Sequence, residues 1–207
     1  MHLNRRSYTA ALLLIGVLMA PSAVQATPAP AASAGAVDLS AIRIDNFGRI
    51  NANYYRGAQP EGRDYETLAA LGIRTVIDLT SDDTDAAEPA SAKRAGLAYF
   101  QIPMTTHEPP SPAKIDQFLK IVNDPANQPV YVHCVGGRHR TGVMTAVYRM
   151  TQDGWGAEQA FQEMKRFKFG ADFLHAEFKS FVYGFHPDVA SAAPAAVETG
   201  TKTPGLR

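Results

Sequence analysis

The sequence predicts an α/β fold in which a mostly parallel central sheet is flanked by helices. Three short runs are rich in β-branched and aromatic residues, which is typical of buried strands: IRTVIDL (73–79), LAYFQIP (97–103) and PVYVHC (129–134). Amphipathic segments separate these runs, and strands that alternate with helices form parallel sheets covered on both faces. The chain of 207 residues is long enough for one such domain with additional segments at its ends.

The N-terminal segment has the pattern of a signal peptide. Arg5 and Arg6 precede an apolar run over 10–19, and Val24-Gln25-Ala26 is a small-residue cleavage site, so we expect residues 1–26 to be removed. The apolar run is too short for a comfortable membrane span. We therefore expect a periplasmic or secreted protein with no stable membrane span after cleavage, exported by either the general or the twin-arginine route.

The remaining boundaries follow from composition. Residues 27–37 are rich in Ala, Pro and Ser and predict a flexible linker, and residues 187–207 predict a disordered tail. The folded domain is expected over 38–186. Lys plus Arg equal Asp plus Glu at 20 each, so the charge balance does not favour a nucleic-acid partner. We expect the domain to be a monomer.

The elements of the domain follow in order. Residues 45–60 predict two short strands with a turn at Gly48. Gly72 and Gly96 are natural C-terminal residues for the first two helices, and Ser111-Pro112 begins the third. The spacing of apolar residues predicts helices over 63–71, 86–95, 113–122, 141–152, 157–166 and 173–183.

The only cysteine of the chain, Cys134, lies at the carboxyl end of the third buried strand, where parallel sheets place their ligand sites. The loop that follows is Val135-Gly136-Gly137-Arg138-His139, and a helix begins after it. Two glycines allow the backbone amides to point inward, and the helix N-terminus adds partial positive charge. This loop therefore predicts an oxyanion cradle, and the same field favours the thiolate form of Cys134.

A thiolate at the base of an oxyanion cradle predicts phosphoryl transfer through a cysteinyl phosphate. Arg140 can offer its fork of donors to two oxygens of the anion and stabilise the charge of the transition state. His133 can orient the thiol or its loop. Thr141 can donate a hydrogen bond to the thiolate when water resolves the intermediate.

The pattern H-C-x5-R-T, formed by His133, Cys134, Arg140 and Thr141, resembles the signature of the cysteine-dependent protein tyrosine and dual-specificity phosphatases. The wider stretch is most similar to the plant and fungal atypical dual-specificity phosphatases, because YYRGAQP, LAALGIRTVIDL, DPANQPVYVHC and the residues 137–142 all resemble that group. The resemblance implies the single-domain cysteine-phosphatase fold, with the P-loop between the last strand and a helix. It also implies that no metal and no cofactor are needed.

The general acid is the part of this pattern that the sequence leaves incomplete. Members of the superfamily use an aspartate on a loop before the cysteine, whereas the corresponding stretch here, IPMTTHEPPSPAK, contains none. Glu108 and His107 are the proton donors it offers, and the atypical group has a similar Glu-Pro pair, so Glu108 is the predicted acid. A solvated loop glutamate is the alternative.

Protein phosphotyrosine is the first predicted substrate class, and dual specificity is compatible with the pattern. An inositol phosphate or pyrophosphate is the alternative, since some members of the atypical group act on inositol pyrophosphates and a phosphate leaving group needs little acid assistance. Arg138 and His139 are candidate ligands for additional phosphates. Two further hypotheses are a non-catalytic module that binds phosphorylated ligands and a sulfur or arsenate transferase.

Four other residues have expected roles outside the chemistry. We expect Arg56 to brace the P-loop, with a position in the active site as the alternative. We expect Asp78 to hold the P-loop by hydrogen bonds, with a catalytic role as the alternative. Phe173 is expected in the core with the other aromatic residues of the C-terminal helices, and His175 on the surface. No group of His, Cys and Asp has metal-ligand spacing in the sequence.

Overall fold

The computed structural model describes residues 42–81 and 83–187. The predicted signal peptide, the predicted linker and positions 188–207 of the predicted tail lie outside the described residues. Within the described part, no helix is both long enough and apolar enough to cross a membrane.

A five-stranded sheet forms the centre of the domain, in the order β1-β2-β5-β3-β4. Only the pair of β1 and β2 is antiparallel, and the other three pairs are parallel. The predicted α/β class with a mostly parallel sheet is therefore confirmed. The strands are β1 (Gly48–Arg49), β2 (Tyr54–Gly57), β3 (Thr75–Asp78), β4 (Ala98–Gln101) and β5 (Val130–His133).

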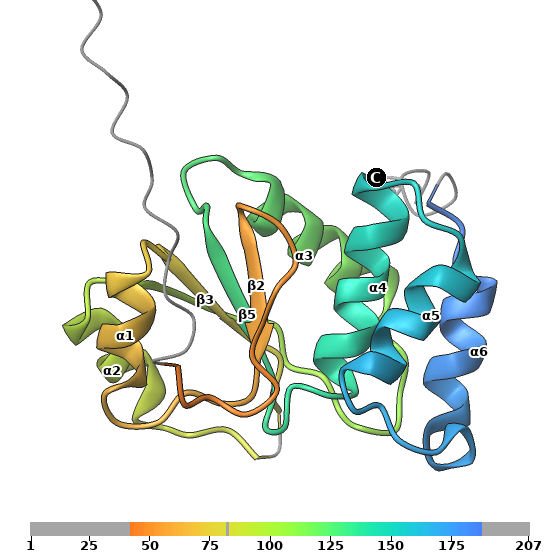
Figure 1. The fold of residues 1–207 in the computed structure, drawn as a ribbon, viewed down its shortest axis with the longest axis horizontal. Coiled ribbons are helices and arrows are strands. Elements are labelled where there is room, and N and C mark those ends of the chain that lie inside the picture. The colour runs from red at the N-terminus through yellow and green to blue at the C-terminus, as the bar shows by residue number, and fades with distance from the viewer. Residues whose placement is uncertain (1–41, 82, 188–207) are drawn as a thin grey trace, which may run out of the picture. The chain divides into compact units, whose positions relative to one another are not determined.

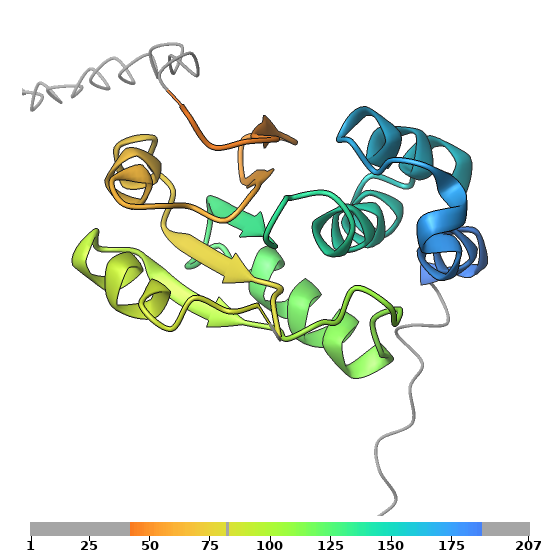
Figure 2. The same ribbon diagram turned by 90° about the horizontal axis from the view of Figure 1, so that it is seen from below.

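Helices cover both faces of the sheet (Figures 1 and 2). On one face lie α1 (Asp64–Ala70) and α2 (Glu88–Arg94), and on the other lie α3 (Pro112–Asn123) and α4 (Arg140–Gln152). Beyond α4, away from the sheet, lie α5 (Ala157–Arg166), η2 (Asp172–His175) and α6 (Ala176–Gly184). Side chains of β5 alternate between these faces, as the period of two in a strand requires. Val132 packs with the α3 and α4 side, whereas Tyr131 packs with α1 and α2.

The predicted helix ends are present. Gly72 and Gly96 follow α1 and α2 with φ of 84° and 79°, a left-handed conformation that glycine adopts without strain. The side chain of Ser111 accepts a hydrogen bond from the amide of Lys114, and Pro112 is the first residue of α3. These local signals set the lengths of the helices that lead into β3, β4 and β5.

The predicted turn at Gly48 was wrong. Gly48 lies inside β1, and the chain turns over residues 50–53, where the side chain of Asn51 accepts a hydrogen bond from the Asn53 amide at 2.8 Å. A Cβ atom at Gly48 would lie 2.4 Å from the ring of Phe167. The glycine is therefore explained by close packing against Phe167, which no local sequence signal reveals.

The last predicted helix, over 173–183, is two elements. The short 3-10 helix η2 precedes α6, and the backbone leaves the helical conformation at His175, with φ of −140°. Phe173 is 81% exposed and is not part of the core. A helical spacing of apolar residues does not distinguish a continuous helix from two short ones that meet at an angle.

Candidate active site

The P-loop connects β5 to α4, and Cys134 lies at its start, where it is only 3% exposed. The loop lines a hollow of about 230 Å³ at the carboxyl end of the sheet. The residues around this hollow are Asp83, Thr106, Cys134, Val135, Gly136, Arg138, His139 and Arg140. Six of these eight were predicted as site residues, and Asp83 and Thr106 were not.

The loop carbonyls are held away from the hollow. The Val135 oxygen accepts a hydrogen bond from the Gln59 amide at 3.0 Å. The Gly137 oxygen accepts from Arg56 Nη2 at 2.6 Å and from Asn46 Nδ2 at 2.8 Å. In a trans peptide the following N–H points opposite to the carbonyl, so these bonds direct the amides of the next residues toward the hollow. The predicted bracing role of Arg56 is visible in this geometry.

Gly137 is required by both its conformation and its surroundings. Its φ is 62°, and a Cβ atom here would lie 2.3 Å from the carbonyl carbon and oxygen of Gly57. The P-loop thus rests directly on the backbone at the end of β2. Gly57 also needs to be small, because a Cβ there would lie 2.3 Å from the hydroxyl of Tyr131.

Arg140, the first residue of α4, binds a carboxylate that sequence reasoning missed. Its Nη1 and Nη2 donate to the two oxygens of Asp83, each at 2.9 Å, and Nη1 also donates to the Met104 oxygen at 3.2 Å. Burial opposes the charge of Arg140, but the hydrogen bonds to Asp83 and the interaction with Cys134 raise its pKa above the ordinary value. The guanidinium therefore stays charged, and Arg140 lines the same hollow as Cys134.

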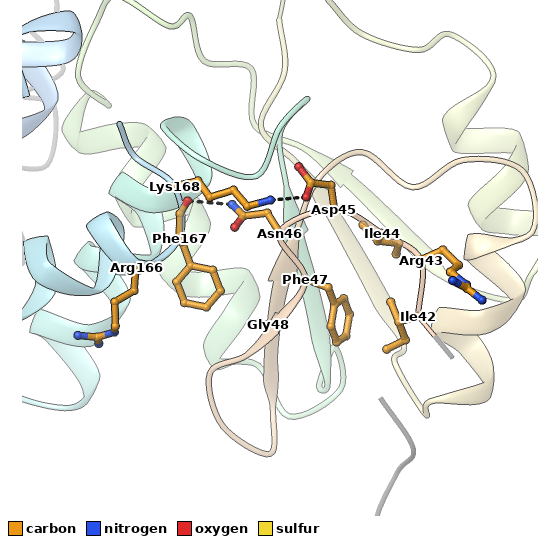
Figure 3. A pocket seen from close by; sticks show the side chains of 10 residues that line it. All are labelled: Ile42, Arg43, Ile44, Asp45, Asn46, Phe47, Gly48, Arg166, Phe167 and Lys168. Carbon is orange, nitrogen blue, oxygen red and sulfur yellow. Dashed lines mark hydrogen bonds and ion pairs between the residues drawn. The ribbon is translucent and has the colours of Figure 1, made fainter. Parts of the chain in front are cut away.

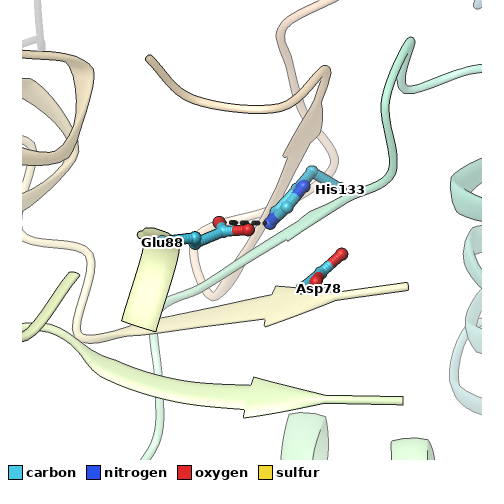
Figure 4. A group of neighbouring side chains, drawn as sticks. All are labelled: Asp78, Glu88 and His133. Atoms are coloured by element: carbon cyan, nitrogen blue, oxygen red, sulfur yellow. Dashed lines mark ion pairs between the residues drawn. The ribbon is translucent and has the colours of Figure 1, made fainter. Parts of the chain in front are cut away.

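His133 is buried on the face of β5 opposite to that of Val132, and it is paired with Glu88 (Figure 4). The His133 Nε2 lies 2.9 Å from Glu88 Oε1, and both side chains are 0% exposed. Gln59 Nε2 donates to the other Glu88 oxygen at 2.7 Å. Glu88 thus fixes the ring that precedes Cys134, a contact between residues far apart in the sequence that no local motif predicts.

Asp78 lies close to this pair but does not hold the P-loop, contrary to expectation. Its carboxylate accepts hydrogen bonds from the Thr80 amide and hydroxyl, the Tyr99 hydroxyl and Gln101 Nε2. Ligand atoms of Asp78, Glu88 and His133 lie within 4.8 Å of one another, all buried. Because these hydrogen bonds already occupy the carboxylate of Asp78, the group has the chemistry of a structural network more than that of a metal centre.

Of the two remaining predicted catalytic residues, Thr141 is buried and Glu108 is exposed. Thr141 is fully buried beside the P-loop, and its hydroxyl makes no hydrogen bond to another described residue. Glu108 is exposed on the loop between β4 and α3, next to His107 and two residues after Thr106, which lines the hollow. Its role as the general acid stays a prediction.

Arg138 and His139 are less available to additional phosphates than expected. Arg138 Nη2 lies 3.5 Å from an oxygen of Asp45. His139 Nε2 lies 3.0 Å from the Phe169 oxygen, and its ring centre lies 3.8 Å from that of His175. Burial, followed by the nearby His175, lowers the pKa of His139. His175 therefore packs against the P-loop, whereas a surface position was expected.

A hollow larger than the one at Cys134 lies elsewhere among the described residues. It measures about 660 Å³ and lies around the start of β1 and the end of α5 (Figure 3). There Asn46 donates to the Phe167 oxygen at 2.9 Å, and Lys168 pairs with Asp45 at 2.5 Å. The chemistry of the nucleophile and its oxyanion cradle, and not cavity size, identifies the smaller hollow as the active site.

Comparisons with known proteins agree with this geometry. Residues 37–180 match a family model described as PTP-NADK, a DSP-PTPase phosphatase fused to NAD+ kinase. The chain is 30% identical over 126 residues to a probable tyrosine-protein phosphatase, DG1060, of Dictyostelium discoideum, which covers 59% of this chain and 75% of that protein. It is 29% identical over 178 residues to the dual specificity protein phosphatase TpbA of Pseudomonas aeruginosa, covering 86% and 77%.

Solved structures show the same fold. The core catalytic domain of the PP-IP phosphatase SIW14 from S. cerevisiae superposes with a TM-score of 0.62 at 25% identity, over 72% of this chain and 90% of that one. A crystal structure of P. aeruginosa TpbA in complex with pTyr gives a TM-score of 0.61 at 25% identity, over 70% and 87%. With the family match, these likenesses confirm the resemblance seen in the motif: the chain belongs to the DSP-type family of cysteine-dependent protein tyrosine phosphatases.

Proposed function

We propose that this chain is an exported phosphatase that hydrolyses phosphotyrosine on proteins through a cysteinyl-phosphate intermediate. The observation that carries the proposal is the placement of Cys134 and the charged Arg140 around the same P-loop hollow. Export is supported by the signal-peptide pattern of residues 1–26.

In the first step, the Cys134 thiolate attacks phosphorus and the bond between phosphorus and the phenolic oxygen breaks. The loop amides and Arg140 hold the three equatorial oxygens, whose charge develops in the transition state. The leaving phenolate takes a proton, which we assign to the carboxylic acid of Glu108 on the adjacent loop. A positioned acid typically contributes about 10²–10⁴-fold to such a step.

In the second step, water attacks the phosphorus of the cysteinyl phosphate and the bond between sulfur and phosphorus breaks. The proton of the water passes to the carboxylate of Glu108, which returns to its starting form with the release of phosphate. The departing group is the Cys134 thiolate. The buried Thr141 hydroxyl, which no other described residue engages, can donate a hydrogen bond to it.

The charge around the active site favours phosphoproteins over inositol polyphosphates. A second hollow, of about 420 Å³, shares Asp83, Val135 and Gly136 with the catalytic one. It is lined by five carboxylates and one guanidinium, those of Asp45, Glu61, Asp64, Asp83, Asp85 and Arg43. Asp45 and Asp83 are paired with cations. The other three carboxylates of this lining, those of Glu61, Asp64 and Asp85, repel a ligand that carries many phosphates.

The state of His139 and Arg138 supports the same preference. Arg138 has a carboxylate neighbour in Asp45, and the lowered pKa of His139 reduces its positive charge near neutral pH. An inositol pyrophosphate remains the second candidate because the superposed SIW14 domain is a PP-IP phosphatase. A weak general acid would also be sufficient for a phosphate leaving group.

The test is phosphate release by residues 27–207, compared with the Cys134→Ser variant. The substrates are a phosphotyrosine peptide, a phosphoserine peptide, inositol hexakisphosphate and an inositol pyrophosphate. We expect release to be fastest from phosphotyrosine and absent in the variant, and peptides with Lys or Arg beside the phosphotyrosine to have higher kcat/KM than those with Asp or Glu. Faster release from the inositol pyrophosphate would overturn the substrate assignment, and binding without release from any substrate would overturn the enzymatic one.

A further inference from the structure

Arg56 is a buried cation that the mechanism above does not use. Arg56 belongs to the buried strand β2, and its side chain is 0% exposed. The guanidinium carbon lies 4.1 Å from the centre of the Phe167 ring, which Figure 3 shows at the end of α5. Nη2 donates to the Gly137 oxygen, but Nε and Nη1 have no hydrogen-bond partner among the described residues.

Burying a guanidinium in this position costs a large amount of free energy unless an anion balances its charge. Burying a charge costs far more than burying a neutral polar group, and a cation–π contact with Phe167 and one carbonyl recover only part of that cost. Desolvation by burial accordingly lowers the pKa of Arg56. The domain therefore needs a negative charge close to Arg56.

The carboxylates near the site each have another partner. Glu163, which influences Arg56, binds Arg149 through both of its oxygens, at 2.8 and 3.1 Å. On the other side of the P-loop, Asp83 binds Arg140 and Glu88 binds His133. No carboxylate among the described residues forms an ion pair with Arg56.

The neighbouring tyrosines are not the missing anion. Burial raises the pKa values of Tyr54 and Tyr131 above the ordinary value for tyrosine. Both phenols are therefore neutral near pH 7. Tyr54 shares a hydrogen bond of 3.1 Å with the hydroxyl of Thr145, and Tyr131 donates to the Ala58 oxygen at 2.6 Å.

Cys134 remains, and the sheet places it correctly. Arg56 pairs with Val132 across the parallel strands β2 and β5, so their side chains share one face of the sheet. Cys134 comes two residues after Val132 and packs in the same cluster. Cys134 also begins the loop whose Gly137 oxygen accepts the hydrogen bond from Arg56, so the guanidinium and the thiol lie on the same side of the sheet and at the same loop.

We propose that Arg56 is a positioning residue whose buried charge is balanced by the Cys134 thiolate, and which thereby keeps the nucleophile ionised from beneath the P-loop. The inference rests on the proposed function in that the thiolate is the nucleophile. Arg140 faces the substrate and is shared with Asp83, whereas Arg56 touches no substrate and acts through the sheet. Its bond to the Gly137 oxygen is a second, separable contribution to the shape of the loop.

Because Cys134 is the only cysteine of the chain, its ionisation can be followed without interference. The rate of alkylation by iodoacetamide and the ultraviolet absorbance of the thiolate would be measured against pH in four variants and the wild type. Arg56→Met removes the charge, and Arg56→Lys keeps it without the fork. Asn46→Ala removes the other donor to Gly137 but no charge, and Arg49→Met removes an exposed charge from the adjacent strand.

We expect the midpoint of the pH profile to rise by about 1–3 units in Arg56→Met, the size of effect that a nearby opposite charge produces. It stays near the wild-type midpoint in Arg56→Lys, Asn46→Ala and Arg49→Met. An unchanged midpoint in Arg56→Met would overturn the proposal, as would equal shifts in Arg56→Met and Arg56→Lys. If Arg56→Met does not fold, Arg56→Gln, which also lacks the charge but keeps an amide that can donate to the Gly137 oxygen, takes its place with the same expected rise of the midpoint.

Different results would overturn the proposed function and the role of Arg56. An ionised thiol that responds to Arg56 but releases no phosphate would remove the proposed function and leave this inference standing. Normal turnover, with the same pH midpoint of thiol ionisation in the wild type and in Arg56→Met, would overturn this inference and leave the proposed function standing.

Discussion

The pair of Arg140 and Asp83 predicts that the substrate phosphoryl group competes with a carboxylate of the protein itself. Asp83 accepts hydrogen bonds from both terminal nitrogens of Arg140, which are the donors suited to two oxygens of a bound anion. A carboxylate held in this way is an acceptor and is poorly suited to donate a proton. The change to make is Asp83→Asn, which removes the charge and keeps the shape.

Two effects determine how much Asp83→Asn changes the affinity for phosphate, and both increase it. The side chain of Arg140 is 3% exposed and that of Asp83 is 42% exposed, so the ion pair belongs at the upper end for accessible pairs, about 1 kcal/mol. Repulsion between the carboxylate and a phosphate anion adds up to about 1 kcal/mol in a solvated environment. The affinity for inorganic phosphate should therefore rise roughly five- to thirtyfold.

The assay is competitive inhibition of phosphotyrosine peptide hydrolysis by phosphate and vanadate, at two salt concentrations. Asp85→Asn is the matched control, because Asp85 lines the adjacent hollow and is not among the residues around the catalytic one. We expect a smaller effect there that disappears at high salt. Weaker inhibition of Asp83→Asn than of the wild type would refute the reasoning and show that Asp83 orients Arg140 for the anion.

Three further predictions concern the loop, the acid and pH. Gly137→Ala should lower the free energy of unfolding by about 2–4 kcal/mol in a denaturant titration, because it adds a clash with Gly57 to a left-handed φ. The control is Gly96→Ala, which also has a positive φ but has open space around it. It should lower the free energy of unfolding by about 1–2 kcal/mol. Glu108→Gln should reduce kcat on phosphotyrosine by about 10²-fold or more and have much less effect on a nitrophenyl phosphate, whose leaving group is more acidic; equal losses on both would remove Glu108 as the acid. Because burial lowers the pKa of His139 in the folded state, the unfolded chain binds more protons below pH of about 6.5, so its contribution to stability is present above that pH and declines on acidification. His139→Asn should flatten this part of the profile of Tm against pH, and an unchanged profile would contradict the assignment.

The fold and the nucleophile loop could be predicted because their signals are local. Of the three strands predicted to be buried, β3 and β5 are fully buried, whereas β4 was wrongly expected to be buried because it is an edge strand and is partly exposed. Glycine or a Ser-Pro pair marks the helix ends beside these strands. The roles of Cys134 and Arg140 follow from residues within one loop and one helix start. For such segments the backbone conformation is determined by neighbours in the sequence, so a pattern of residue types is sufficient.

The partners of these residues could not be predicted in the same way. Asp83 lies 57 positions from Arg140, and the pairing depends on where the loop after β3 ends relative to α4. The contact of Arg56 with Gly137 spans 81 positions and arises because β2 and β5 are adjacent in the sheet. An acidic loop and an arginine in a strand are common features, and only the strand order makes them parts of one site.

Trapping the intermediate would show whether Cys134 carries the phosphoryl group during turnover. The protein would be mixed with excess phosphotyrosine peptide, quenched in acid within the first turnover, digested and analysed by mass spectrometry. Thr141→Ala, in which departure of the thiolate loses its hydrogen-bond donor, serves as the companion variant. We expect the fragment containing Cys134 to gain the mass of one phosphoryl group, to a larger extent in Thr141→Ala. Phosphate release without any such gain, or a gain on a different residue, would contradict this expectation.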